Sequence, residues 1–219
     1  MASIPLPNGA QIALATTIGI AMAVSDISNA NPAVAAAAGH TLTEGGIALL
    51  NTGWTKTDNS VIRVGEVASG TFGIQGLNAT NTNRYPTGGG AGSARAITGW
   101  TQLPKIPTFE TTGGDAKATT TSYIDFEKDF EMFTGSNPER LNLTISYQPG
   151  TPAYEALVEA SEGGEMQILR LVLKNGSTLY YPGQLFFNKA PTVTKDQEMV
   201  NAISIALQGE ITRYAKLVA

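Results

Sequence analysis

The sequence predicts a mainly β protein: a two-sheet, sandwich-like or barrel-like fold with one short flanking α-helix and an inserted small β-barrel module. Three observations support this prediction. Apolar and polar residues alternate with a period of two in several segments, a single segment has helical spacing, and short strand-like runs in the first half are separated by turn residues. With 219 residues, the chain can form one medium domain or two small ones.

The predicted strands of the second half have one apolar face each. In the first of them, leucine, isoleucine and tyrosine occupy the odd positions and polar residues the even ones, which is typical of a strand with one buried face. The second strand ends at Asn175-Gly176, a pair that favours a type I′ hairpin turn. The strands are expected at residues 141–147, 169–174, 178–187 and 200–207.

One segment between these strands has the spacing of a helix. Thr151 and Pro152 provide an N-cap and a proline at the first helical position, an apolar stripe follows, and Gly163-Gly164 ends the segment. A helix of about three turns is marginal alone, so its stability must come from packing on the sheet.

Residues 21–96 differ in texture from the rest of the chain. Short strand candidates alternate there with turn sequences, a spacing that is typical of a small barrel. The glycine-rich run at residues 87–92 predicts a flexible exit linker. The sequence therefore predicts a discontinuous main domain, residues 1–20 and 97–219, and an inserted module, residues 21–96.

Composition excludes several classes of protein. The chain has no cysteine, which rules out disulfide scaffolds and zinc–thiolate sites. Only 15% of its residues are charged, against about a quarter in an ordinary soluble chain, so we expect much of the surface to face other protein. The net charge of −4 and the lack of a basic stripe argue against sequence-specific DNA binding.

The most apolar stretch, residues 10–24, is shorter than a membrane span, and no basic residue precedes it. We therefore expect neither a membrane anchor nor a signal peptide, no membrane partner, and assembly in a cytoplasm.

The strongest local signal is the acidic segment from Tyr123 to Met132. If this segment is a strand, its apolar residues share one face and four carboxylates form a ladder on the other. Such a ladder is either an ordinary solvated face or a negative wall past which a polyanion slides. The four carboxylates are those of Asp125, Glu127, Asp129 and Glu131.

Enzyme activity has little support in the sequence. Asp125 and Glu127 have a spacing compatible with glycoside hydrolysis, but no neighbouring group promises the raised pKa of a general acid. His40 is the single histidine, so neither a metal site nor a Ser–His pair can be completed, and we predict a turn histidine with satisfied hydrogen bonds. We expect no cofactor, no metal and no catalysis.

The order of these features resembles that of the major tail tube proteins of long-tailed, siphophage-type bacteriophages, with residues 4–20 supplying the amino-terminal strand. The matching features are Gly99–Leu103 opening a strand, the polar excursion Thr111–Ala118, the strand at 141–147, the helix at 152–162, the segment 168–174 with Asn175-Gly176, the strand start Tyr181-Pro182-Gly183 and the strand at 203–207. The module is similar to one inserted in a branch of that family, through Asn31-Pro32-Ala33-Val34, Ala38-Gly39-His40 and Arg63-Val64.

The resemblance implies a structural virion protein. Its subunits would close into hexameric rings that stack into the hollow tail tube, and the tube would conduct double-stranded DNA into the host during ejection without binding it specifically. Head-to-tail stacking generates such an open filament. The implied partners are the tape measure protein, the tail terminator and the distal tail proteins, and the implied location is the virion tail after assembly in the host cytoplasm.

The resemblance also suggests roles for residues. An acidic lining would keep DNA mobile, so the candidates for lining the lumen are Asp125, Glu127, Asp129 and Glu131. The loop that projects in the family and engages the next ring corresponds to Thr111, Thr112, Gly113, Gly114, Asp115, Ala116, Lys117 and Ala118.

A carbohydrate-binding or adhesin-like β module is the alternative from a different class. Trp54, Trp100, Tyr180 and Tyr181 would then stack on sugars. Isolated aromatic residues are more often core or interface residues.

Overall fold

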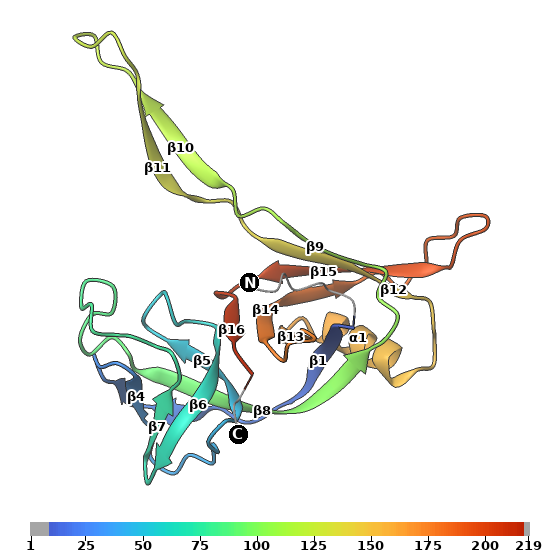
Figure 1. The fold of residues 1–219 in the computed structure, drawn as a ribbon, viewed down its shortest axis with the longest axis horizontal. Coiled ribbons are helices and arrows are strands. Elements are labelled where there is room, and N and C mark those ends of the chain that lie inside the picture. Colours follow the sequence, from blue (N-terminus) through green and yellow to red (C-terminus); the bar gives the residue numbers. More distant parts are fainter. Residues whose placement is uncertain (1–8, 217–219) are drawn as a thin grey trace.

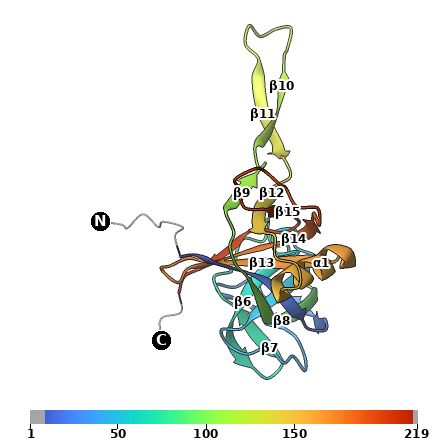
Figure 2. The same ribbon diagram turned by 90° about the vertical axis from the view of Figure 1, so that its right-hand side faces the viewer.

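The computed structural model describes residues 9–216 and has a mainly β fold with a single helix, as the sequence predicts (Figures 1 and 2). We divide it into a body, a module and an arm. The body contains β1, β8, β9, α1 and β12–β16. The module contains β2–β7 and shares the first half of β8, and the arm is the hairpin β10–β11.

The body is a curled antiparallel sheet with the strand order β8-β1-β13-β14-β15-β12-β9. The sheet folds over on itself, so that Leu14 of β1 and Leu143 of β12 lie in the same buried cluster. Helix α1 closes this cluster with the fully buried Leu157. The strands are β1 (Gln11–Ile18), β8 (Gly92–Leu103), β9 (Thr108–Thr112), β12 (Arg140–Ser146), β13 (Met166–Val172), β14 (Thr178–Phe187), β15 (Val200–Leu207) and β16 (Thr212–Tyr214).

The four strands predicted in the second half are confirmed as β12–β15. Tyr147, which the alternation places in the core, lies just beyond β12 and is 36% exposed. The turn after β13 also differs from the prediction, because a type I′ turn needs two residues with positive φ and only Gly176 has one (82°). Instead, Gly176 ends a three-residue loop in which the Asn175 side chain accepts a hydrogen bond from the Ser177 N–H.

Helix α1 (Pro152–Gly163) begins and ends where the sequence predicts. The Thr151 hydroxyl accepts a hydrogen bond from the Tyr154 N–H at 3.3 Å, and Gly164 follows the last turn with a φ of 62°. Within residues 9–216, no helix is long and apolar enough to cross a membrane.

The module is a closed small barrel. Strands β8, β5, β6, β7 and β4 pair in that order, β3 pairs with β4 and β2 with β8, and Ser25 alone separates β2 from β3. Trp54 and Phe72 fill its interior, and the Trp54 indole donates a hydrogen bond to the Pro86 carbonyl oxygen at 2.7 Å. Its strands are β2 (Met22–Val24), β3 (Asp26–Ile27), β4 (Ala33–Ala36), β5 (Ile47–Thr52), β6 (Ser60–Ala68) and β7 (Thr71–Ile74).

The glycine-rich run is not a flexible linker, so that prediction is wrong. Gly92 begins β8, which continues without a break from the module into the body. A Cβ atom at Gly92 would lie 2.0 Å from the Asn51 carbonyl oxygen, and one at Gly90 would lie 2.9 Å from the Cβ atom of Ile27. Glycine is required here because the backbones approach closely. A domain boundary after residue 96 falls inside this strand and remains a proposal.

Strand β16 clamps the module to the body. It pairs with β14, while the Thr212 hydroxyl donates to the Val61 carbonyl oxygen at 2.7 Å. The Tyr214 hydroxyl accepts from the Arg63 N–H at 3.0 Å, and the Arg63 guanidinium lies 4.7 Å from the centroid of the Tyr214 ring. Burial raises the pKa of Tyr214, and the contacts with Arg63 oppose this shift.

A buried cluster shared by module and body lies next to this clamp. It joins Val61 of β6 to Ile168 of β13 and Tyr180 of β14, all of which are almost completely buried. The Arg170 guanidinium stacks 4.2 Å from the centroid of Trp100 beside this cluster, and burial lowers the pKa of Arg170. Removing the module would therefore expose apolar surface of the body.

We expect Ile168→Ala to reduce the free energy of unfolding by about 2–5 kcal/mol, because it opens a cavity in the shared cluster. Urea unfolding followed by far-UV circular dichroism and by the fluorescence of Trp54 and Trp100 tests this. The two signals should change in one coincident transition, whereas exposed Thr119→Ala should change neither midpoint. Separate transitions would show that module and body do not share a core.

Candidate assembly surface

The arm is a two-stranded hairpin that projects from the body (Figures 1 and 2). Its strands are β10 (Ala116–Thr121) and β11 (Phe130–Ser136), which pair with each other and with no strand of the large sheet. Every residue of the two strands is exposed except the half-buried Thr121. A lone hairpin is marginally stable in water, and the sheet of the described residues adds no strand to this one.

Two glycines set the direction of the arm at its base. Gly113 and Gly114 have φ angles of 84° and 78°, a region that favours glycine. A Cβ atom at Gly113 would lie 2.1 Å from the Pro138 carbonyl oxygen. The Gly114 N–H donates to the Asn137 carbonyl oxygen at 3.3 Å, and the Asn137 N–H donates to the Asp115 carbonyl oxygen at 2.8 Å. The arm therefore continues the β9–β12 ribbon beyond a turn.

The loop predicted at residues 111–118 lies at the base of the arm, but the arm is longer than the predicted loop. Of the predicted loop at residues 111–118, the first two residues end β9, residues 113–115 form the connection, and the last three begin β10. The predicted loop is thus the base of a longer hairpin, and the glycine pair is the signal that marked it correctly.

The segment from Tyr123 to Met132 is not one strand, so that prediction is wrong. Residues 122–129 form the connection at the end of the arm, and β11 begins at Phe130. Phe126 packs edge-on against Phe130 at 5.3 Å between ring centroids and against Tyr123 at 6.3 Å. These aromatic residues pack on one another instead of on a sheet. The alternation of apolar and polar residues therefore does not mark a strand with one buried face here.

The acidic ladder consequently does not form. Asp125, Glu127 and Asp129 lie in the connection, and only Glu131 lies in a strand. The Ser122 hydroxyl donates to the Asp129 carboxylate at 2.5 Å and closes the base of the connection. The proposal that these carboxylates line a lumen therefore loses the strand on which it was based.

The arm also exposes large apolar side chains. Ile124 is completely exposed, Phe133 is 76% exposed, and Phe126 and Met132 are more than half exposed. Apolar groups gathered on a projecting element are typical of a surface that another protein covers.

The edge and outer face of the β9–β12 region form a second exposed surface. Within residues 9–216, β9 pairs with β12 on one side and leaves its other edge open. The face turned away from α1 carries a polar network: the Thr108 and Thr144 hydroxyls lie 2.7 Å apart, Asn142 donates to Thr112 at 3.1 Å, and Ser204 donates to Asn142 at 3.0 Å. This face is mostly polar, and its charged side chains on β9 and β12, Glu110 and Arg140, have opposite charges.

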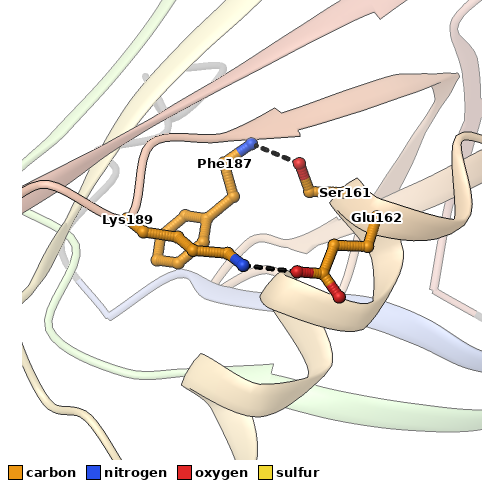
Figure 3. A network of polar contacts seen from close by, with 4 residues as sticks. All are labelled: Ser161, Glu162, Phe187 and Lys189. Atoms are coloured by element: carbon orange, nitrogen blue, oxygen red, sulfur yellow. Dashed lines mark hydrogen bonds and ion pairs between the residues drawn. The ribbon is translucent and has the colours of Figure 1, made fainter.

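The β14–β15 connection, residues 188–199, is a further projection, at the right of Figure 1. Its start is fixed to the end of α1 by two contacts (Figure 3). Lys189 forms an ion pair with Glu162, and the Phe187 N–H donates to the Ser161 hydroxyl at 3.0 Å. Helix and connection therefore hold one another in place.

The other candidate residues do not form a site. Trp54, Tyr180 and Tyr181 are buried, and Trp100 is covered on one face by Arg170, so they offer no exposed sugar-stacking platform. The residues that the structure describes contain no group of three His, Asp or Glu side chains that could hold a metal.

His40 is a turn histidine, as predicted. Its Nε2 atom lies 3.2 Å and 3.1 Å from the carbonyl oxygens of Ala68 and Thr71. Its buried Nδ1 atom has no partner within residues 9–216, so only one ring nitrogen meets the expectation of satisfied hydrogen bonds.

The projecting arm, its exposed apolar side chains and the open edge of β9 are typical of a protein that other protein covers. A family model described as "Phage tail tube protein, TTP" matches residues 52–216, and the chain belongs to this family of tail tube proteins. The match begins inside the module and extends through the body and the arm. It confirms the family that the order of sequence features suggested.

Several solved structures are similar over about half of this chain. The tail of an empty GTA particle with C6 symmetry is 9% identical, with 53% of this chain and 87% of that chain covered and a TM-score of 0.41. The sheath/tube terminator of the PVC extracellular contractile injection system is 16% identical, covers 52% and 87%, and has a TM-score of 0.37. The anti-feeding prophage baseplate is 9% identical, covers 54% and 86%, and has a TM-score of 0.37. No curated protein matches the chain.

We expect Gly113→Ala to misdirect the arm and to abolish regular tubes. Alanine meets both an unfavourable φ and the Pro138 carbonyl oxygen, so the base of the arm must shift. Gly150→Ala is the matched control, because Gly150 has a similar φ of 80° but open space around it. Negative-stain microscopy and thermal melting of both variants test this. Regular tubes from Gly113→Ala would refute a role for the base of the arm.

Proposed function

We propose that the chain closes into hexameric rings, that the rings stack into the hollow tail tube, and that the tube conducts double-stranded DNA during ejection. The observation that supports this most directly is the arm, a hairpin with exposed apolar side chains that pairs with no other strand within residues 9–216. Membership of the tail tube family supports a second copy of this chain as the partner, and we assign to the arm the contact between rings.

The open edge of β9 supports a second contact, within the ring. An unpaired edge invites pairing with another strand, and closing a sheet across subunits removes such edges. We assign the β9 edge to contacts between neighbouring subunits. The small barrel of the module lies away from this edge, and we place it on the outside of the tube.

The bore is lined, in this proposal, by the face of β9, β12 and β15 that is turned away from α1. Its hydroxyl and amide groups offer DNA no cluster of cations. Glu110 and Arg140 lie diagonally on paired strands, so their charges offset each other. Duplex DNA carries one charge for about every 1.7 Å of axis, and a lining without net positive charge leaves it free to move.

The family supports the location and the partners that we propose. Membership of the tail tube family places the protein in the virion tail. We propose that the tail is of the siphophage type, that the tube assembles in the host cytoplasm, and that it contacts a tape measure protein, a tail terminator and distal tail proteins.

Replacing residues 115–136 by an Asn-Gly turn tests the role of the arm. The variant should melt at the temperature of the wild-type monomer, because β10 and β11 pair only with each other and all of their residues except Thr121 are exposed. It should form no tubes, whereas wild-type protein should form rings and hollow filaments in negative stain. Six-fold averages would support hexameric rings, and filaments from the armless variant would exclude the arm from stacking.

A charge change on the proposed bore tests DNA conduction. Glu110→Lys should slow DNA ejection from assembled virions at low salt, and raising the salt concentration should restore the rate, because phosphate contacts release counterions. Glu155→Lys is the matched control, since it makes the same charge change at an exposed position on α1. Equal ejection rates for the two variants at low salt would reject this face as the lining.

A further inference from the structure

The end of the body formed by the β13–β14 turn and β16 is basic. Lys174 lies in the turn, Arg213 in β16 and Lys216 two residues after β16, and all three are exposed. The turn and β16 are adjacent, because Thr178 pairs with Tyr214. We call Lys174, Arg213 and Lys216 the basic end.

No acidic side chain of the same copy neutralises the basic end within residues 9–216. The ion pairs among these residues are those of Lys56 with Glu210 and of Lys189 with Glu162, and neither includes a residue of the basic end. Three cations on neighbouring segments repel each other, which favours an anionic partner over solvent alone.

The end of the arm has the complementary charge. The segment from Tyr123 to Met132, which we call the tip, carries four carboxylates and one ammonium group and is therefore three charges negative. Its aromatic cluster of Tyr123, Phe126 and Phe130 lies among these carboxylates. Lysine and arginine suit such a surface, because they form ion pairs with carboxylates and cation–π contacts with ring faces.

The tip cannot reach the basic end of its own copy. Figure 1 shows the arm rising from the β9–β12 side of the body, with its end far from β16, which lies beside the module. The occupant of each surface must therefore come from another molecule.

We propose that the tip of the arm of one copy binds the basic end of another copy in the assembled tube. This pairing rests on the proposed function, since it names the surface that the arm engages. Carboxylates of the tip pair with Lys174, Arg213 and Lys216, while the apolar stems of these cations cover the aromatic cluster. Exposed charges are screened over about 8–10 Å at 0.1–0.15 M salt, so tube assembly weakens as salt rises.

Charge exchange tests the pairing. The tip-reversed variant carries Asp125→Lys, Glu127→Lys and Glu131→Lys. It retains Asp129, because the Asp129 carboxylate accepts a hydrogen bond from the Ser122 hydroxyl. The end-reversed variant is Lys174→Glu, Arg213→Glu and Lys216→Glu. The tip then becomes three charges positive and the basic end three charges negative.

Each reversed variant alone should raise the critical concentration for tube formation at least about tenfold, measured by sedimentation and negative stain, because like charges now meet. An equimolar mixture of the two variants should restore tubes, since every tip then finds an oppositely charged end on the other variant. One chain carrying all six changes should do the same. Thermal melting confirms that each variant is folded, and Glu155→Lys with Glu159→Lys on α1 controls for charge change alone.

The outcomes separate this pairing from the proposed function. Suppose that the wild-type protein forms tubes. Normal assembly of either reversed variant would then overturn the pairing, and so would a lack of recovery in both the mixture and the six-change chain. In either case the tube function would still stand. Failure of the wild-type protein to form tubes would overturn the proposed function, and this pairing with it.

Discussion

Strand β8 belongs to three buried clusters, and the arrangement of the other parts depends on it. Ala94 lies in the core of the module, Ile97 in the shared cluster and Leu103 in the core of the body. Because one continuous backbone passes through all three, the strands that pair with its two halves have a fixed relative position. The clamp at β16 then joins surfaces that are already aligned, which explains how a three-residue strand is sufficient.

The rest of the chain provides the stability of the fold, whereas the arm provides a surface for association. Burial of apolar side chains in the three clusters stabilises the body and the module, whereas the arm leaves its apolar side chains in water. An isolated chain gains nothing from such an element. In the assembly that we propose, the arm contributes free energy when another molecule covers it, so residues that add little to folding drive association. The low content of charged residues fits a chain whose surface is largely shared with its copies.

The sequence predicts the parts of the fold in which side chains pack on a layer. Alternation identified β12 and β15 because each has one buried face, and it located β13 and β14 although neighbouring residues of these two strands are buried in different clusters. It failed at residues 123–132, where the aromatic residues pack on one another in a turn and no layer exists to impose a period. The glycine content of residues 87–92 led to the wrong prediction of a flexible linker, because a glycine that allows close packing and a glycine in a linker are identical in sequence. The clamp between Arg63 and Tyr214 joins residues 151 positions apart, which no local pattern encodes.

The glycine pair at the base of the arm makes the arm a lever. A strand of six or seven residues is about 20 Å long, so a rotation of about 10° at Gly113 and Gly114 displaces the far end by about 3–4 Å, nearly the spacing of neighbouring strands. Such a displacement changes which groups meet at the tip while every buried cluster stays intact. In the stacked assembly that we propose, small rotations at these joints let the tube curve while the body and the module of each subunit stay rigid.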